Sequence, residues 1–171
     1  MKWVKFYSLL TFLYVFQTVL GDGIRIFGIL PDLMFVLTVY VSLKEKRPGV
    51  LVFALVSGIL KDFSLMQTFG LNGFITLYIS FLISVVAEKY FYPTIFVNGF
   101  FVFTAGFLYQ VCYFFLKFTM WGEERVVYPL MNVILPQCLY NFVVSFLIFI
   151  LCTYISGEKK ISLKSIRRGS K

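Results

Sequence analysis

The sequence predicts an all-α integral membrane protein, built as a bundle of six transmembrane helices. Hydrophobic residues make up 60% of the 171 residues, and only 14% of the residues are charged. The mean hydropathy is +0.87. A soluble domain of this length requires far more polar surface than such a composition can supply. We therefore expect one transmembrane domain over residues 1–156, followed by a basic cytoplasmic tail over residues 157–171.

Six apolar segments are long enough to be membrane spans, because a bilayer core of about 30 Å requires roughly 20 apolar residues in a helix. The predicted spans cover about residues 3–20, 26–43, 50–69, 71–87, 94–118 and 126–155. The first span ends at Gly21-Asp-Gly, which is a poor signal-peptide cleavage site, and another span follows directly. We therefore interpret residues 3–20 as a retained helix.

The next boundaries follow from charged or turn-forming residues. The second span ends at the basic loop Lys44–Gly49, and the third is interrupted by Lys61-Asp62. The fourth begins after Gly70, and polar residues around Trp121–Arg125 separate the fifth span from the sixth. The sixth contains Pro136, which we expect to kink or break the helix, because a proline in a helix interior removes a hydrogen bond.

Two central spans are predicted to be unusually short. Asp32–Leu43 is all that remains between Pro31 and the basic loop, and Val50–Leu60 is all that precedes Lys61. Each piece is about 18 Å long or less at 1.5 Å per residue, so neither crosses a bilayer core alone. Interrupted segments at membrane depth need protein or water to satisfy their backbone groups. We therefore expect these spans to line an internal cavity or a polar seam between helices.

The basic residues predict the orientation by the positive-inside rule. Of the 16 Lys and Arg, 12 fall on one side of six alternating spans. The four on the opposite side are Arg25, Lys61, Lys117 and Arg125. Both termini are therefore predicted to be cytoplasmic. The net charge of +8 is then explained by helix orientation and by contact with anionic lipid, and no nucleic-acid partner is expected.

Polar residues within the spans are the candidate functional residues, because an acid inside a bilayer is unfavourable by roughly 2.5–3.5 kcal/mol on insertion scales. The predicted orientation gathers these residues in the outer half of the bundle. The candidate polar seam consists of Pro31, Asp32, Asp62, Asn72, Gln110, Pro136 and Asn141. Structural roles are also open for the acids. Asp32 suits a helix N-terminus, and Asp62 could pair with Arg25 or Lys61.

Four motifs in this order resemble the MreD family of rod-shape-determining membrane proteins. The motifs are Pro31-Asp-Leu33, Gly58-Ile-Leu-Lys-Asp62, Gly70-Leu-Asn72 and Pro136-Gln-Cys-Leu-Tyr-Asn141. The resemblance covers about residues 25–155. Lys61, directly before the acid, departs from the family pattern, in which Leu is frequent at this position.

The resemblance implies a bacterial inner-membrane scaffold without catalytic activity and without a cofactor, acting in the machinery that builds the lateral cell wall. Its implied partners are an MreC-like single-span periplasmic protein and, directly or indirectly, MreB, the glycosyltransferase RodA and a penicillin-binding transpeptidase. The family is also thought to share its fold with the S components of energy-coupling-factor transporters. On this basis, replacing Asp62 is expected to leave membrane insertion normal while weakening partner binding.

Two other functions remain open at this stage. A substrate-binding S component of a vitamin transporter would use an outer-half cavity containing Asp32, Asp62, Asn72 and Gln110. An intramembrane hydrolase or transferase is disfavoured because the chain contains no His, which is the commonest general base and metal ligand. Small residues four apart, such as Ala54 and Gly58, permit close helix contact, either within one chain or between copies in a homo-oligomer.

Overall fold

The computed structural model describes residues 2–25, 28–65, 70–90, 95–121 and 134–156. This part of the chain is helical throughout its six elements, without a β-strand. The helices are α1 (Lys2–Ile24), α2 (Leu33–Lys44), α3 (Gly49–Leu65), α4 (Leu71–Tyr90), α5 (Ile95–Trp121) and α7 (Leu135–Ser156). The predicted all-α fold class is confirmed, and four described helices, α1, α4, α5 and α7, are long and apolar enough to cross a membrane.

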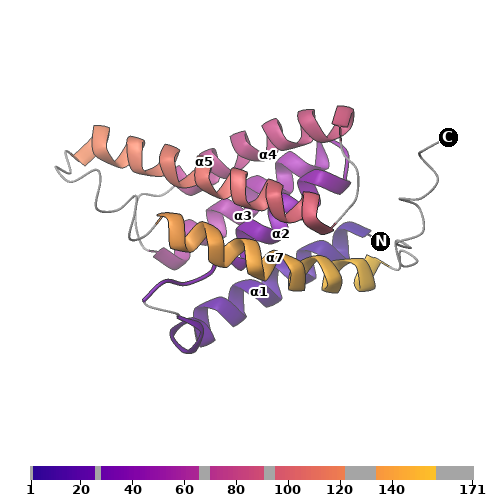
Figure 1. Ribbon diagram of the computed structural model, residues 1–171, viewed down its shortest axis with the longest axis horizontal. Helices are drawn as coiled ribbons and strands as arrows, with labels where there is room; N and C mark the ends of the chain where they lie inside the picture. The colour runs from indigo at the N-terminus through magenta and orange to yellow at the C-terminus, as the bar shows by residue number, and fades with distance from the viewer. Residues whose placement is uncertain (1, 26–27, 66–69, 91–94, 122–133, 157–171) are drawn as a thin grey trace.

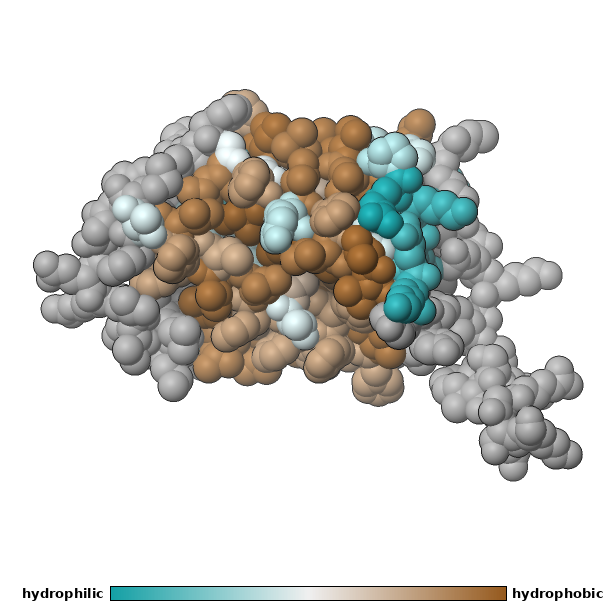
Figure 2. All heavy atoms as spheres, turned by 90° about the horizontal axis from the view of Figure 1, so that it is seen from above, coloured by the Kyte–Doolittle hydropathy of each residue, from teal (hydrophilic) through white to brown (hydrophobic). Residues whose placement is uncertain are grey.

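The helices run roughly side by side, with α2 and α3 in the middle of the bundle and α1, α4, α5 and α7 around them (Figure 1). The start of α1 and the end of α7 lie at the same end of the molecule. Figure 2 shows an apolar band across the middle of one face, with hydrophilic residues gathered at one end. This distribution is the one expected for a bundle that lies across a bilayer.

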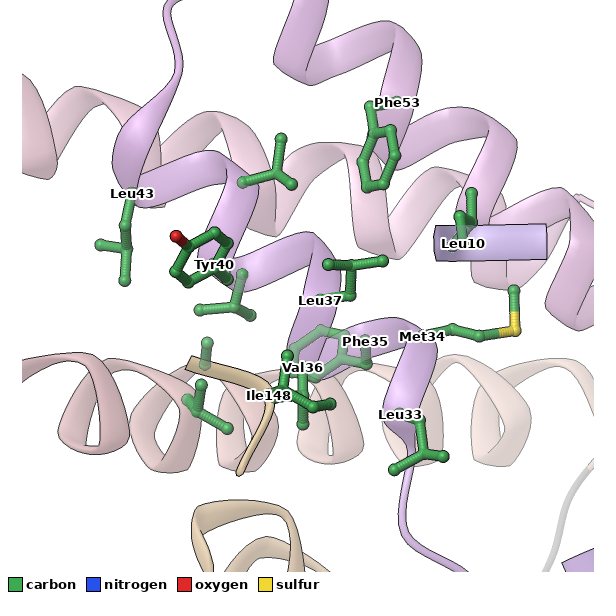
Figure 3. Packing of buried hydrophobic residues seen from close by; sticks show 14 of the residues in the cluster. Leu10, Leu33, Met34, Phe35, Val36, Leu37, Tyr40, Leu43, Phe53 and Ile148 are labelled. Carbon is green, nitrogen blue, oxygen red and sulfur yellow. The ribbon is translucent and has the colours of Figure 1, made fainter. Parts of the chain in front are cut away.

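The central helix α2 is the shortest, at 12 residues. Every residue from Leu33 to Leu43 is buried, as expected for a helix that is apolar on all sides. Its side chains point outward in all directions toward the surrounding helices (Figure 3). At about 18 Å it is shorter than a bilayer core, as the sequence predicted.

Aromatic contacts join α2 to two of the surrounding helices. The Tyr40 ring lies edge-on to Phe149 of α7, with centroids 5.8 Å apart. The Phe35 ring lies 4.9 Å from Tyr109 of α5. Such ring pairs add about 0.5–1.5 kcal/mol beyond the burial of their area. These contacts fix α2 as the core around which the longer helices pack.

The predicted start of the second span differs from the observed helix. The second span was expected to be helical from residue 26, but α2 begins at Leu33, and residues 28–32 are not helical. Gly28 has a positive φ of 80°, and Pro31 disfavours a helical conformation at the residue before it. In the sixth span, Pro136 lies in the first turn of α7, where a missing N–H is tolerated. The predicted kink involves residues 126–133, which lie outside the described part of the chain.

Candidate functional site

The N-terminus of α2 is fixed by Asp32, which is the N-cap of the helix. Its carboxylate oxygen Oδ1 accepts a hydrogen bond of 3.0 Å from the backbone N–H of Phe35. Pro31, which is also buried, directly precedes this cap. An N-cap of this kind satisfies one of the N–H groups that a helix leaves without a partner, and it contributes about 1 kcal/mol. The structural role suggested for Asp32 by the sequence is confirmed.

The non-helical segment before α2 is held by side chains from other helices. Asn141 Oδ1 on α7 accepts a hydrogen bond of 2.7 Å from the backbone N–H of Asp32. Gln17 Oε1 on α1 accepts from the N–H of Leu33 at 3.2 Å. Irregular backbone at membrane depth is stable only where protein or water satisfies it, and here two amide side chains do so.

A second link to this segment comes from two glutamines. Gln110 on α5 donates a hydrogen bond of 2.6 Å to Gln137 on α7. Gln137 in turn donates to the carbonyl oxygen of Leu30 at 3.4 Å. Gln110 therefore reaches the entry to α2 through Gln137.

Lys61 on α3 turns into the bundle and forms an ion pair with Asp32. Its ammonium also donates to the Tyr109 hydroxyl at 2.8 Å and lies 4.2 Å from the centre of the Tyr109 ring. The sequence suggested Lys61 as a partner of Asp62, and this was wrong, because Lys61 pairs with Asp32 at the start of α2. Because neighbours at i and i+1 do not face each other, Lys61 and Asp62 have separate partners.

Asp62 satisfies the N-terminus of α4. Its carboxylate accepts hydrogen bonds from the backbone N–H groups of Gly70 at 2.9 Å, Asn72 at 3.2 Å and Gly73 at 3.3 Å. The Asn72 side-chain amide donates a fourth, at 2.7 Å. The positive end of the α4 dipole adds a favourable interaction with this carboxylate. Asp62 is therefore an N-terminal cap supplied by a different helix.

Gly58 allows α4 to come close enough for this capping. A Cβ atom at Gly58 would lie 2.5 Å from the Cα of Gly73 and 2.7 Å from the Asn72 carbonyl oxygen. Only a residue without a side chain fits there, because the obstructing atoms belong to the backbone. Gly58 and Asp62 are one helical turn apart on the same face of α3. The spacing in Gly58-Ile-Leu-Lys-Asp62 thus combines close helix contact with capping.

Tyr109 connects the two acids through hydrogen bonds. Its hydroxyl accepts from Lys61 and donates to the side-chain oxygen of Asn72, whose amide donates to Asp62. We call Asp32, Lys61, Tyr109, Asn72 and Asp62 the buried polar network. It joins the start of α2, the end of α3, the start of α4 and the middle of α5. Satisfied chains of this kind rigidify a core, because leaving one member unpaired is costly in a low dielectric.

The structure brings most of the sequence-predicted residues together. Asp32, Asp62, Asn72 and Asn141 are each 4% exposed or less. Their polar groups are hydrogen-bonded within the protein, so this part of the predicted seam faces inward.

Four contributors were missing from the predicted site residues. They are Lys61, Tyr109, Gln17 and Gln137. The signal for Gln17 was an amide in an otherwise apolar span, which is the same signal that identified Gln110. Tyr109 gave no signal, because it is one of 11 tyrosines in the chain.

Comparison with protein families identifies the kind of membrane protein to which this architecture belongs. The model of the family described as rod shape-determining protein MreD matches residues 1–155. The chain belongs to the MreD family. The match confirms the resemblance inferred from the four motifs. The chain is therefore a rod-shape-determining membrane protein. Neither the curated proteins nor the solved structures contain a match.

Proposed function

We propose that this MreD-family chain is a non-enzymatic scaffold of the bacterial cell-elongation complex. It binds an MreC-like single-span protein and couples it to the MreB filament and to lateral peptidoglycan synthesis by RodA and a penicillin-binding transpeptidase. The observation that supports this proposal is the family match over residues 1–155 of a chain of 171 residues. The match covers the six described helices except for Ser156, the last residue of α7, so the assignment concerns the whole bundle.

The geometry of the buried polar network suits a scaffold. Its charged groups are paired with one another or with backbone N–H groups, so they serve to position helices. Partner binding then depends on these residues indirectly, through the shape of the bundle that they fix. The exposed helix faces are rich in large apolar side chains, such as Phe12, Phe100 and Leu147. Such faces are suited to lipid and to the transmembrane helix of a partner.

The proposed location is the bacterial inner membrane, with both termini in the cytoplasm and residues 157–171 as a basic tail. The support is the distribution of Lys and Arg, which places 12 of 16 on one side of the spans. The basic tail and the Lys44–Pro48 loop would then meet the anionic lipids of the cytoplasmic leaflet.

Depletion of the protein in its own rod-shaped host tests the proposal. Cells that lose the protein should become round, and an intact copy should restore rods. Co-purification with the MreC-like protein should fall in parallel with the amount of the chain. Cells that keep their rod shape after depletion would contradict the role in elongation.

The alternative, an S component of a vitamin transporter, is tested on the purified chain. In the structure, Asp32, Asp62 and Asn72 are buried and bonded to protein groups, so they do not line an open solute site. A thermal-shift screen of the purified chain with vitamins should show no saturable ligand. A saturable shift with one vitamin, together with co-purification of transporter ATPases, would favour the transporter over the scaffold.

A further inference from the structure

The two halves of α1 differ in how tightly they pack against the bundle. In the first half, the buried side chains, each 8% exposed or less, are Phe6, Leu9, Leu10 and Leu13. From residue 14 to residue 20 no side chain is buried, and Val19 is 72% exposed. Helices in a membrane are held together by packing contacts and hydrogen bonds. The second half of α1 is therefore held less firmly than the first.

Aromatic rings fix the first half of α1 to α3. The Phe53 ring of α3 lies 5.2 Å from the Tyr7 ring and 6.4 Å from the Trp3 ring, measured between centroids. The Phe6 ring lies edge-on to Phe53 at 6.5 Å. At the first residue of α3, Gly49, a Cβ would lie 2.3 Å from the Trp3 ring, so the two helices are in close contact there. Ring pairs at these distances attract each other beyond the burial of their area, so this end of α1 is a fixed point.

The second half of α1 contacts the start of α2 at two points. Gln17 Oε1 accepts the hydrogen bond of 3.2 Å from the Leu33 N–H. Gly21 is buried beside Leu30, because a Cβ at Gly21 would lie 3.5 Å from both terminal carbons of that side chain. Both contacts are made with residues at the entry to α2, and neither of them reaches α3.

A pocket of about 200 Å³ lies between the second half of α1 and the end of α3. Tyr14 and Thr18 line it from α1, Met34 lines it from α2, and Lys61 and Ser64 line it from α3. Side chains that border unfilled space lack packing partners on that side. In Figure 1 the end of α1 lies apart from the other helices. The pocket thus marks the place where α1 diverges from α3.

Movement of the second half of α1 would act on the buried polar network. Gln17 satisfies the N–H of Leu33, which directly follows the N-cap residue Asp32. Asp32 is ion-paired with Lys61, whose side chain lines the pocket and is 17% exposed. When α1 swings away, the Gln17 contact breaks and the pocket widens beside Lys61. Water can then replace the lost acceptor, because the pocket is lined by exposed residues such as Ser64.

We propose that α1 is a pivoting helix. The pivot is the aromatic cluster of Trp3, Phe6, Tyr7 and Phe53. Residues 14–24 swing away from α3, and the pocket opens sideways. The contacts of the second half with the entry to α2 hold the closed position. Changes beside α1 are thereby transmitted to the start of α2 and to its ion pair with α3. The device rests on contacts within the chain, so it is independent of the proposed function.

The test measures how fast a cysteine placed in the pocket reacts with N-ethylmaleimide, in the full chain reconstituted in nanodiscs. The native Cys112, Cys138 and Cys152 are first replaced with Ala. Met34→Cys is the reporter, because Met34 lines the pocket and is only 3% exposed. With dilute reagent, modification is slower than closing, so its rate follows the open fraction. Gln17→Met should speed the reaction by roughly two- to tenfold, the range for loss of one neutral hydrogen bond.

A second reporter distinguishes a pivot from detachment of the whole helix. Leu10→Cys replaces a side chain in the first half of α1 that is 1% exposed. Gln17→Met should leave its reaction rate unchanged, because the aromatic cluster keeps this half in place. An equal increase at both reporters would overturn the pivot. Equal rates for Met34→Cys with and without Gln17→Met would overturn the opening itself.

Gly21→Ala changes the closed position in the opposite direction and removes no contact. Its added Cβ would meet Leu30 at 3.5 Å, an ordinary van der Waals distance. It should slow the reaction of Met34→Cys by about twofold, as expected for a few new atom contacts. The matched control is Gly23→Ala, whose Cβ would have nothing within 4 Å, and it should leave the rate unchanged. Equal rates for the two alanine variants would contradict the closed position that we propose.

Discussion

Replacing Asp62 with Asn should destabilise the folded bundle without impairing membrane insertion. The carboxylate accepts hydrogen bonds from Gly70, Gly73 and both nitrogens of Asn72. An asparagine that keeps its oxygen toward Asn72 places an NH₂ group where Oδ2 now accepts from Gly70 and Gly73. Two donors then lose their acceptor and face another donor.

The size of the effect follows from the two lost contacts. Hydrogen bonds to charged groups contribute about 1.5–3 kcal/mol each, and contacts that share one carboxylate are not additive. We therefore expect the free energy of unfolding to fall by about 3 kcal/mol. For a chain of this length, this loss corresponds to a lowering of the melting temperature by about 6–12 °C. Insertion itself becomes more favourable, because a charge is removed from the membrane.

Two measurements on the same samples separate insertion from folding. The amount of Asp62→Asn in the membrane fraction, measured just after synthesis, should equal that of the wild type, while its melting temperature in detergent should be lower. Glu88→Gln is the matched control, because it makes the same change at a side chain that is 54% exposed. Exposed ion pairs contribute about 0–1 kcal/mol, so this control should melt close to the wild type.

The result also separates the two roles considered for Asp62. A melting temperature equal to that of Glu88→Gln would refute the capping argument. If partner binding were lost in that case, a direct role of the charge in the interaction would be favoured, as the sequence alone suggested.

Three further predictions follow from the packing and the orientation. Gly58→Ala should lower the free energy of unfolding by about 1–3 kcal/mol, and with it the melting temperature, because its Cβ meets the backbone of α4. The control is Gly23→Ala, whose Cβ would have nothing within 4 Å, and it should leave the melting temperature unchanged or raise it. Tyr109→Phe should cost about 1–3 kcal/mol by leaving the Asn72 oxygen without its donor, whereas Tyr154→Phe, at a residue that is 89% exposed, should have no measurable effect in the same melting assay. Reporter fusions in the Lys44–Pro48 loop should be active in the cytoplasm, and periplasmic activity there would reverse the proposed orientation.

Composition and segment length were enough to predict the all-α membrane bundle and its short central helix. The apolar run through Asp32–Leu43 predicted the extent of α2 well, because a helix that is apolar on all sides has to be buried. The start of the second span was placed too early, at residue 26. Its apolar residues gave no indication of the positive φ of Gly28, and a non-helical entry is stable here only because Gln17 and Asn141 satisfy it.

The candidate site could be predicted by residue type and only partly by pairing. The two acids were identified because charges inside a bilayer are rare. Their partners were not identified. Lys61 and Asp32 are 29 positions apart in the sequence, and their contact depends on how α2 and α3 align. Likewise, the capping of α4 by Asp62 depends on the close contact between α3 and α4 at Gly58. The sequence motif around Gly58 does not say which helix makes that contact.

The scaffold proposal is tested most directly by binding between purified proteins. The full chain and the MreC-like protein of the same host, each reconstituted in nanodiscs or combined in detergent, should form a stable complex at a fixed stoichiometry. Glu88→Gln should bind as the wild type does, and Gly58→Ala should bind less in proportion to its loss of folded protein. Absence of any complex between the two intact wild-type proteins would contradict the account.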